Sequence, residues 1–132
     1  MADCEKTVDL QLENKIVLVT GGAKGIGAAI VRAGAAEAAI PVIVDRDAEA
    51  SKNLHTEIAT GHVVIADLLS PADCQNAIES TVEKFGRLDA LVNNAGINDK
   101  VGLEHGTPEQ YAGSLGRICC ITTTWRISRF PI

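Results

Sequence analysis

The sequence has little of three things: excess positive charge, long apolar runs, and cysteines spaced for a metal. Acidic residues outnumber basic ones, 17 to 12, which gives a net charge of −5. This balance offers no basic surface to neutralise phosphates, and so argues against a nucleic-acid partner. No apolar run approaches the roughly 18 residues that a membrane-spanning helix needs, so we expect no membrane insertion.

The cysteines and the N-terminus indicate a reducing compartment. Cys4, Cys74, Cys119 and Cys120 form no Cys-x-x-Cys pair and have no histidine grouped with them, so we expect no metal site. The first six residues are polar and contain no signal-peptide apolar stretch. Free thiols without an export signal predict a cytoplasmic protein.

Strand and helix signals alternate strictly along the chain. The expected strands are 15–20, 40–45, 62–66 and 88–92. The expected helices are 25–38, 47–60 and one from Pro71, with another beginning at Thr107. With 46% hydrophobic residues, the chain can build one domain with a real core. Such alternation is typical of an α/β fold, in which helices cover both faces of a parallel sheet.

Within the first expected helix, Ile26, Ile30 and Ala33 are spaced to face the core. Gly34 stands in the helix interior, where its low propensity costs roughly 1 kcal/mol relative to alanine. Ala38 stands near the helix end, where a left-handed glycine is common. Both residues depart from an optimal helix.

Residues 20–27 read Thr-Gly-Gly-Ala-Lys-Gly-Ile-Gly and join the first strand to this helix. Glycines permit a sharp turn and a close approach of backbone amides to phosphate, and a helix N-terminus favours negative charge. The order of strand, glycine turn and helix predicts a site for a dinucleotide pyrophosphate. A tight turn without a ligand is the alternative. The candidate contacts are Thr20, Gly21, Lys24, Gly25, Ile26 and Gly27.

Asp45 closes the second expected strand. A carboxylate there can accept hydrogen bonds from an adenosine ribose and would repel a 2′-phosphate, which favours NAD over NADP. Lys24 and Arg46 act in the opposite direction, because a cation near that ribose can hold the phosphate. The sequence thus predicts NAD, with NADP as the less favoured cofactor. A solvated acid at the strand end is the alternative for Asp45.

Two further motifs follow the third and fourth expected strands: Asp67-Leu68 and Asn93-Asn94-Ala95-Gly96. With the glycine loop and Asp45, they resemble the short-chain dehydrogenase/reductase family over about residues 10–115. The resemblance implies a Rossmann-type doubly wound parallel sheet, truncated after the fourth strand and the start of the next helix. It also implies a homo-oligomer for the intact proteins.

The resemblance gives these two motifs a role at the cofactor. It implies that Asp67 and Leu68 meet the adenine, and that Asn93, Ala95 and Gly96 approach the nicotinamide ribose. A turn-forming Asp67 and a half-structural Asn93 remain alternatives.

The catalytic residues of the resembled family have no counterpart in this chain. That family uses a serine and a Tyr-x-x-x-Lys pair, in which the lysine lowers the pKa of the tyrosine that acts as base. Here the single tyrosine, Tyr111, is followed four residues later by Leu115. We assign no catalytic residue, and expect a cofactor-binding half that binds NAD weakly or not at all and has no dehydrogenase activity alone.

The substrate expected of an intact form is a secondary alcohol or a sugar. The loop from residue 97 to 106 looks most like members of the family that oxidise sugars of the fucose type. A non-catalytic nucleotide-binding module and an unstable truncated product are the alternatives to an oxidoreductase.

The last residues, 116–132, break the pattern. When the codons for residues 118–127 are read one base earlier, they allow Asn-Leu-Leu-His-Tyr-Tyr-Asn-Met-Ala-His, which resembles the helix expected after Leu115. This predicts a domain over residues 1–115 and a frameshifted tail over 116–132. Nucleotide sequence through codon 116 tests the prediction.

Overall fold

Four parallel strands form the sheet in the computed structural model, which describes residues 9–96 and 104–115. Their order is β3-β2-β1-β4. The strands are β1 (Ile16–Thr20), β2 (Ile40–Asp45), β3 (His62–Ile65) and β4 (Ala90–Val92). In register, Leu18 of β1 lies opposite Val42 of β2 and Leu91 of β4. The predicted α/β class and strand alternation are confirmed.

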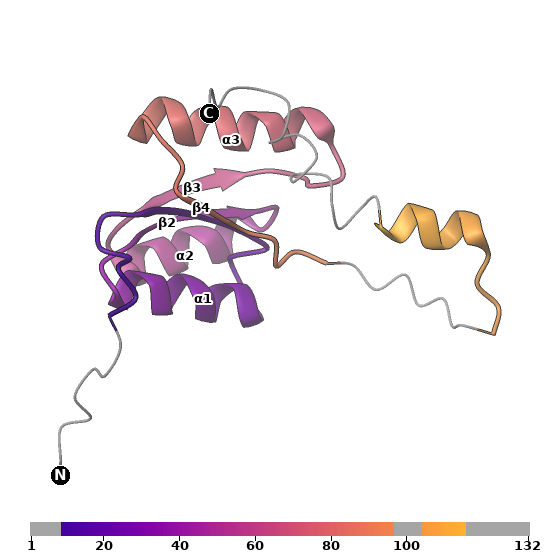
Figure 1. The fold of residues 1–132 in the computed structure, drawn as a ribbon, viewed down its shortest axis with the longest axis horizontal. Coiled ribbons are helices and arrows are strands. Elements are labelled where there is room, and N and C mark those ends of the chain that lie inside the picture. Colours follow the sequence, from indigo (N-terminus) through magenta and orange to yellow (C-terminus); the bar gives the residue numbers. More distant parts are fainter. Residues whose placement is uncertain (1–8, 97–103, 116–132) are drawn as a thin grey trace, which may run out of the picture.

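Helices cover both faces of this sheet (Figure 1). The helices α1 (Gly25–Ala36) and α2 (Ala48–Ile58) pack on one face, and α3 (Pro71–Phe85) packs on the other. The central strands are therefore buried on both sides, which explains why they read as continuous apolar runs. The doubly wound arrangement predicted from the sequence is confirmed.

Two core clusters fill the space between the helices and the sheet. The first contains Leu18, Val44 and Ala77, and the second contains Val19 and Val31. Adjacent residues Leu18 and Val19 enter opposite clusters because side chains alternate along a strand. The sheet thus packs against a hydrophobic cluster on each face, and this packing positions the carboxyl ends of the strands, from which the loops begin.

The face of α1 was predicted only in part: Ile30 packs against the second core cluster as predicted, but Ile26 and Ala33 do not face the core. Ile26 is 75% exposed and Ala33 is exposed, whereas Gly27, Ala28 and Val31 are buried. The reason is a close approach of the helix start to the glycine turn: a Cβ on Gly27 would lie 2.0 Å from the Gly21 carbonyl oxygen. Small residues must face inward there, and this contact turns Ile26 toward solvent.

Most other boundaries agree within two residues, and the helix ends differ for local reasons. α1 stops at Ala36, two residues earlier than predicted, and β4 is shorter than predicted. α2 ends at Ile58, and its C-cap residue Ala59 has a left-handed φ of 54°. The helix predicted from Thr107 covers residues 108–115, with reciprocal bonds between Thr107 and Gln110. The predictions for residues 97–103 and 116–132 lie outside the described residues.

The turn after α1 contains an alanine in a conformation that favours glycine. Ala38 has φ 61°, and the turn is closed by bonds from Ala38 N to Ala35 O and from Ala39 N to Gly34 O, both 3.0 Å. This pair of bonds is the Schellman arrangement, in which the left-handed residue is usually glycine. A left-handed residue with a Cβ costs roughly 1–2 kcal/mol.

Replacing Ala38 by glycine is expected to raise the free energy of unfolding by about 0.5–1 kcal/mol, because relief of strain exceeds the added entropy of the unfolded chain. Urea denaturation measures the change. The matched control is Ala35→Gly inside the same helix, expected to lower stability by about 1 kcal/mol. A loss of stability in Ala38→Gly would contradict the described turn.

Among the residues that the structure describes, no helix combines the length and apolarity needed to cross a membrane.

Candidate functional site

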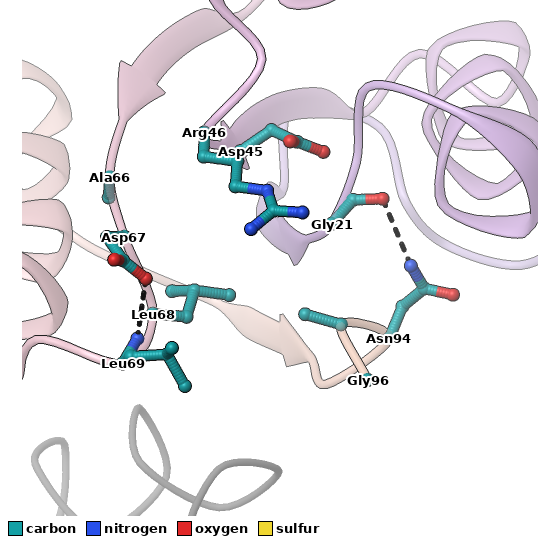
Figure 2. Close-up of a pocket in the computed structure, with 10 residues that line it drawn as sticks. Gly21, Asp45, Arg46, Ala66, Asp67, Leu68, Leu69, Asn94 and Gly96 are labelled. Atoms are coloured by element: carbon teal, nitrogen blue, oxygen red, sulfur yellow. Dashed lines mark hydrogen bonds between the residues drawn. The ribbon is translucent and has the colours of Figure 1, made fainter. Parts of the chain in front are cut away.

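A cavity of about 260 Å³ opens at the carboxyl edge of the sheet, where the loops after all four strands meet (Figure 2). The chain places β2 and then β3 on one side of β1 and β4 on the other, so the cavity lies where the strand order reverses, the usual ligand position in open α/β sheets. Its lining residues are Gly21, Asp45, Arg46, Ala66, Asp67, Leu68, Leu69, Asn94, Ala95 and Gly96.

The glycine loop packs tightly beside this cavity. Gly21 and Gly25 have φ of 61° and 55°, and Gly21 N donates to Val44 O at 2.8 Å. At the start of α1 the N-cap is Lys24, whose side chain makes no capping bond, and the first turn carries no acidic residue. α2 and α3 differ, because Asp47 and Ser70 cap them. The N-terminus of α1 is thus suited to an external anion.

Asp45 connects the end of β2 to the glycine loop. Its Oδ2 accepts from Ala23 N and its Oδ1 accepts from Asp47 N, both at 3.1 Å. A carboxylate has about four acceptor positions, so roughly half of them remain for hydroxyl donors. The two backbone bonds fix the orientation of the side chain at the cavity wall.

Two cations flank Asp45. The Arg46 side chain extends toward the middle of the cavity, between Gly21 and Leu68 (Figure 2). Lys24 instead pairs with Asp47, with Nζ 2.5 Å from Oδ2. This lysine holds the pKa of Asp47 below its usual range, and the Ala50 amide adds to the effect; the same pairing raises the pKa of Lys24. The pair is therefore ionised on both sides at neutral pH.

Thr20 and Asn94 tie the glycine loop to the segment after β4. The Thr20 hydroxyl donates to Val92 O at 3.3 Å and accepts from the amides of Asn94 and Ala95 at 3.1 and 3.0 Å. The Asn94 side-chain amide donates to the carbonyls of Thr20 and Gly21 at 3.0 and 3.1 Å, and the second bond is drawn in Figure 2. Thr20 is fully buried, so this network is shielded from water.

Asp67 forms the wall opposite Gly21. Its Oδ1 accepts from Leu69 N at 3.0 Å (Figure 2), and its own amide donates to Asp73 Oδ2 at 2.9 Å. The side chain therefore closes a turn and also borders the cavity. The turn-forming alternative for Asp67 and the cavity position are compatible.

Seven of the predicted cofactor contacts line the cavity: Gly21, Asp45, Arg46, Asp67, Leu68, Ala95 and Gly96. Six do not: Thr20, Lys24, Gly25, Ile26, Gly27 and Asn93. Thr20 and Gly27 are buried and support the loop, whereas Lys24, Gly25 and Ile26 are exposed at the start of α1. Asn93 is exposed.

Three lining residues were not predicted: Ala66, Leu69 and Asn94. Ala66 and Leu69 flank the Asp67-Leu68 motif, so their position at the end of the third strand could have predicted that they line the cavity. Asn94 stands in the quoted Asn-Asn-Ala-Gly motif, and only the choice between its two asparagines was missed. Within residues 9–96 and 104–115, no group of three or more His, Cys, Asp or Glu side chains is arranged to hold a metal.

Comparisons with known proteins give a consistent match. The sequence model of the family described as short chain dehydrogenase matches residues 15–115. The L-fucose dehydrogenase of Rattus norvegicus is 40% identical over 96 residues, which are 73% of this chain and 36% of that protein. The short-chain dehydrogenase reductase 3a of Arabidopsis thaliana is 38% identical over 95 residues, 70% of this chain and 37% of that protein. The chain thus spans about a third of these relatives.

Solved structures agree with the described fold. The 3-ketoacyl-(acyl-carrier-protein) reductase of Brucella melitensis, complexed with NADH, matches with a TM-score of 0.75 and 36% identity. The match covers 88% of this chain and 50% of the reductase chain. A blue fluorescent protein from a metagenomic library, in complex with NADPH, matches with a TM-score of 0.74 and 31% identity. This match covers 89% of the present chain and 52% of the fluorescent protein. These neighbours hold a reduced nicotinamide dinucleotide, one of each type.

Proposed function

Because the chain belongs to the short-chain dehydrogenase family, we propose that it holds the adenosine and pyrophosphate portions of a nicotinamide dinucleotide for an oxidoreductase. The observation that carries the proposal is the position of Asp45. Its carboxylate stands at the cavity wall, fixed by Ala23 of the glycine loop, beside the open N-terminus of α1. A ribose acceptor next to an anion-binding turn matches the two ends of an adenosine diphosphate.

Different parts of the cavity wall would contact different parts of the dinucleotide. Leu68 and Leu69 supply an apolar surface for a base, and the Asp67 carboxylate borders the same side. The pyrophosphate would meet the amides at the start of α1, since α1 has neither an acidic first turn nor a side-chain cap. Ala95 and Gly96 continue the cavity toward the nicotinamide half.

We propose NAD rather than NADP as the preferred cofactor. Asp45 would repel a 2′-phosphate, and the charge of Lys24 is already neutralised by Asp47. Arg46 is then the cation that lines the cavity, next to the Asp45 carboxylate. We also propose that binding by this chain alone is weak, because the described residues surround mainly the adenosine half.

For the substrate, the similarity to L-fucose dehydrogenases supports a secondary alcohol or a sugar hydroxyl. Its oxidation to a carbonyl moves a hydride to the nicotinamide and releases the hydroxyl proton. No described residue is assigned to that proton transfer: Tyr111 lies on the helix over 108–115, is 68% exposed, and is outside the cavity lining.

Asp45→Asn is expected to weaken NAD binding about tenfold, because it removes one charged acceptor from the ribose position. NADP binding is expected to change less, since the repulsion of its phosphate is lost together with the acceptor. Isothermal titration calorimetry with excess nucleotide measures both. Glu83→Gln on the exposed face of α3 is the control for the lost charge. Equal NAD affinity in Asp45→Asn and the wild-type chain would contradict the proposed role.

A further inference from the structure

The ion pair between Lys24 and Asp47 joins the glycine loop to the helix after β2. Asp47 is the N-cap of α2, and its Oδ1 accepts from Ala50 N at 3.0 Å. Its other oxygen, Oδ2, holds Lys24 Nζ at 2.5 Å. One oxygen of the carboxylate is thus fixed by the helix, and the other is presented to the lysine in a set position.

Asp45 extends this contact into a closed ring. Asp47 N donates to Asp45 Oδ1, and Ala23 N donates to Asp45 Oδ2. Since Lys24 directly follows Ala23, the ring returns to the glycine loop where it began. Asp45, the ribose acceptor of the proposed site, is itself a member of this ring. The charges of Asp47 and Lys24 therefore contribute to the charge that a 2′-phosphate on that ribose would meet.

We propose that Asp47 is a specificity-determining residue: by holding Lys24, it withholds the cation of the glycine loop from a 2′-phosphate and favours NAD over NADP. This rests on the proposed function, because it assumes that the adenosine ribose lies at Asp45. Asp47 acts through Lys24 and need not touch the cofactor, so it is a positioning residue.

The physical reason is a competition for one ammonium group. The Lys24 side chain is 72% exposed and has a flexible four-carbon stem, so it can reach another anion once Asp47 loses its charge. Bonds from an ammonium to phosphate oxygen are charge-assisted and stronger than neutral ones. Loss of the Asp47 charge also removes a repulsion toward phosphate. The test must therefore distinguish two effects: Lys24 becoming free to bind the 2′-phosphate, and the loss of repulsion between Asp47 and that phosphate.

Three variants of the full chain, compared with the unmodified chain, make this separation. Asp47→Asn removes the charge but keeps a good N-cap on α2. Lys24→Gln combined with Asp47→Asn removes both charges and restores the wild-type net charge. Glu57→Gln breaks the ion pair between Arg32 and Glu57, outside the cavity lining, with the same change of charge as Asp47→Asn. The unmodified chain is the reference.

The measured quantity is the ratio of the dissociation constants for NAD and NADP, obtained by equilibrium dialysis at one ionic strength. In Asp47→Asn we expect a shift of about fivefold toward NADP. The double variant and Glu57→Gln are expected to stay within about twofold of the wild-type ratio.

Two results would overturn the inference while leaving the proposed function intact. One is NAD binding by the wild-type chain with an unchanged ratio in Asp47→Asn. The other is a double variant that keeps the whole shift, which would assign the effect to repulsion alone. If neither the wild-type chain nor any variant binds either dinucleotide, the proposed function fails, and the inference fails with it.

Discussion

Gly27→Ala is expected to abolish dinucleotide binding and to lower the free energy of unfolding by about 3 kcal/mol or more. An added Cβ would lie 2.0 Å from Gly21 O and 2.6 Å from Asn94 Nδ2. Either the glycine loop or α1 must move, and the bond between Asn94 and Gly21 would be displaced. Alanine gains about 1 kcal/mol over glycine in helix propensity, which is too little to offset such an overlap.

Gly34 provides the matched control on the same helix. Among the described residues, a Cβ at Gly34 would meet only the Ala39 Cβ, at 3.8 Å, which is an ordinary contact. Gly34→Ala is therefore expected to raise stability by up to about 1 kcal/mol. Thermal and urea unfolding of both variants measure the difference. Two variants with similar, small effects would show that α1 does not approach the glycine loop as described.

Thr20→Val is the second large effect that we expect. Valine has nearly the shape of threonine, but it removes the hydroxyl that accepts from the amides of Asn94 and Ala95. The Asn94 amide keeps its second acceptor, Val92 O at 3.1 Å, but the Ala95 amide loses this acceptor beside a fully buried side chain, which is expected to cost about 1–3 kcal/mol of stability. NAD binding should weaken as well, because Ala95 lines the cavity.

Thr20→Ser separates the hydroxyl from the methyl group. Serine keeps the hydroxyl and loses one methyl group, so we expect a stability loss of only about 1 kcal/mol and retained NAD binding. The pair of variants is compared by urea denaturation and by calorimetric titration with NAD. If serine and valine destabilise equally, the hydroxyl network does not hold the loop to the segment after β4.

The sheet was predictable because each strand is a short apolar run followed by a turn signal. Asp45, at the end of such a run, had to lie at the carboxyl edge of a parallel sheet, where the cavity is. The face of α1 was only partly predictable from periodicity, which placed Ile30 correctly. Ile26 looks like a core residue, but the inward positions are set by the close approach of Gly27 to Gly21, which is a tertiary contact.

The supporting contacts of the site could not be read from the sequence either. Thr20 was predicted to contact the cofactor, yet it lies beneath the loop and binds the segment after β4. The resemblance named Asn93, but Asn94 lines the cavity; the side chains of adjacent residues in extended backbone point in opposite directions, and the sequence does not show which of the two faces the cavity. The pairing of Lys24 with Asp47 joins two loops, and only the fold brings them together.

The central claim is that the carboxyl edge of this sheet holds the adenosine and pyrophosphate portions of a nicotinamide dinucleotide. A titration of the ¹⁵N-labelled chain with NAD, followed by the ¹H–¹⁵N NMR spectrum, tests it most directly, since weak binding is detected residue by residue. We expect saturable shifts confined to the amides of residues 21–27, 45–47, 66–69 and 94–96, with none of them in Gly27→Ala. Saturable shifts elsewhere, or none in the wild-type chain, would contradict the claim.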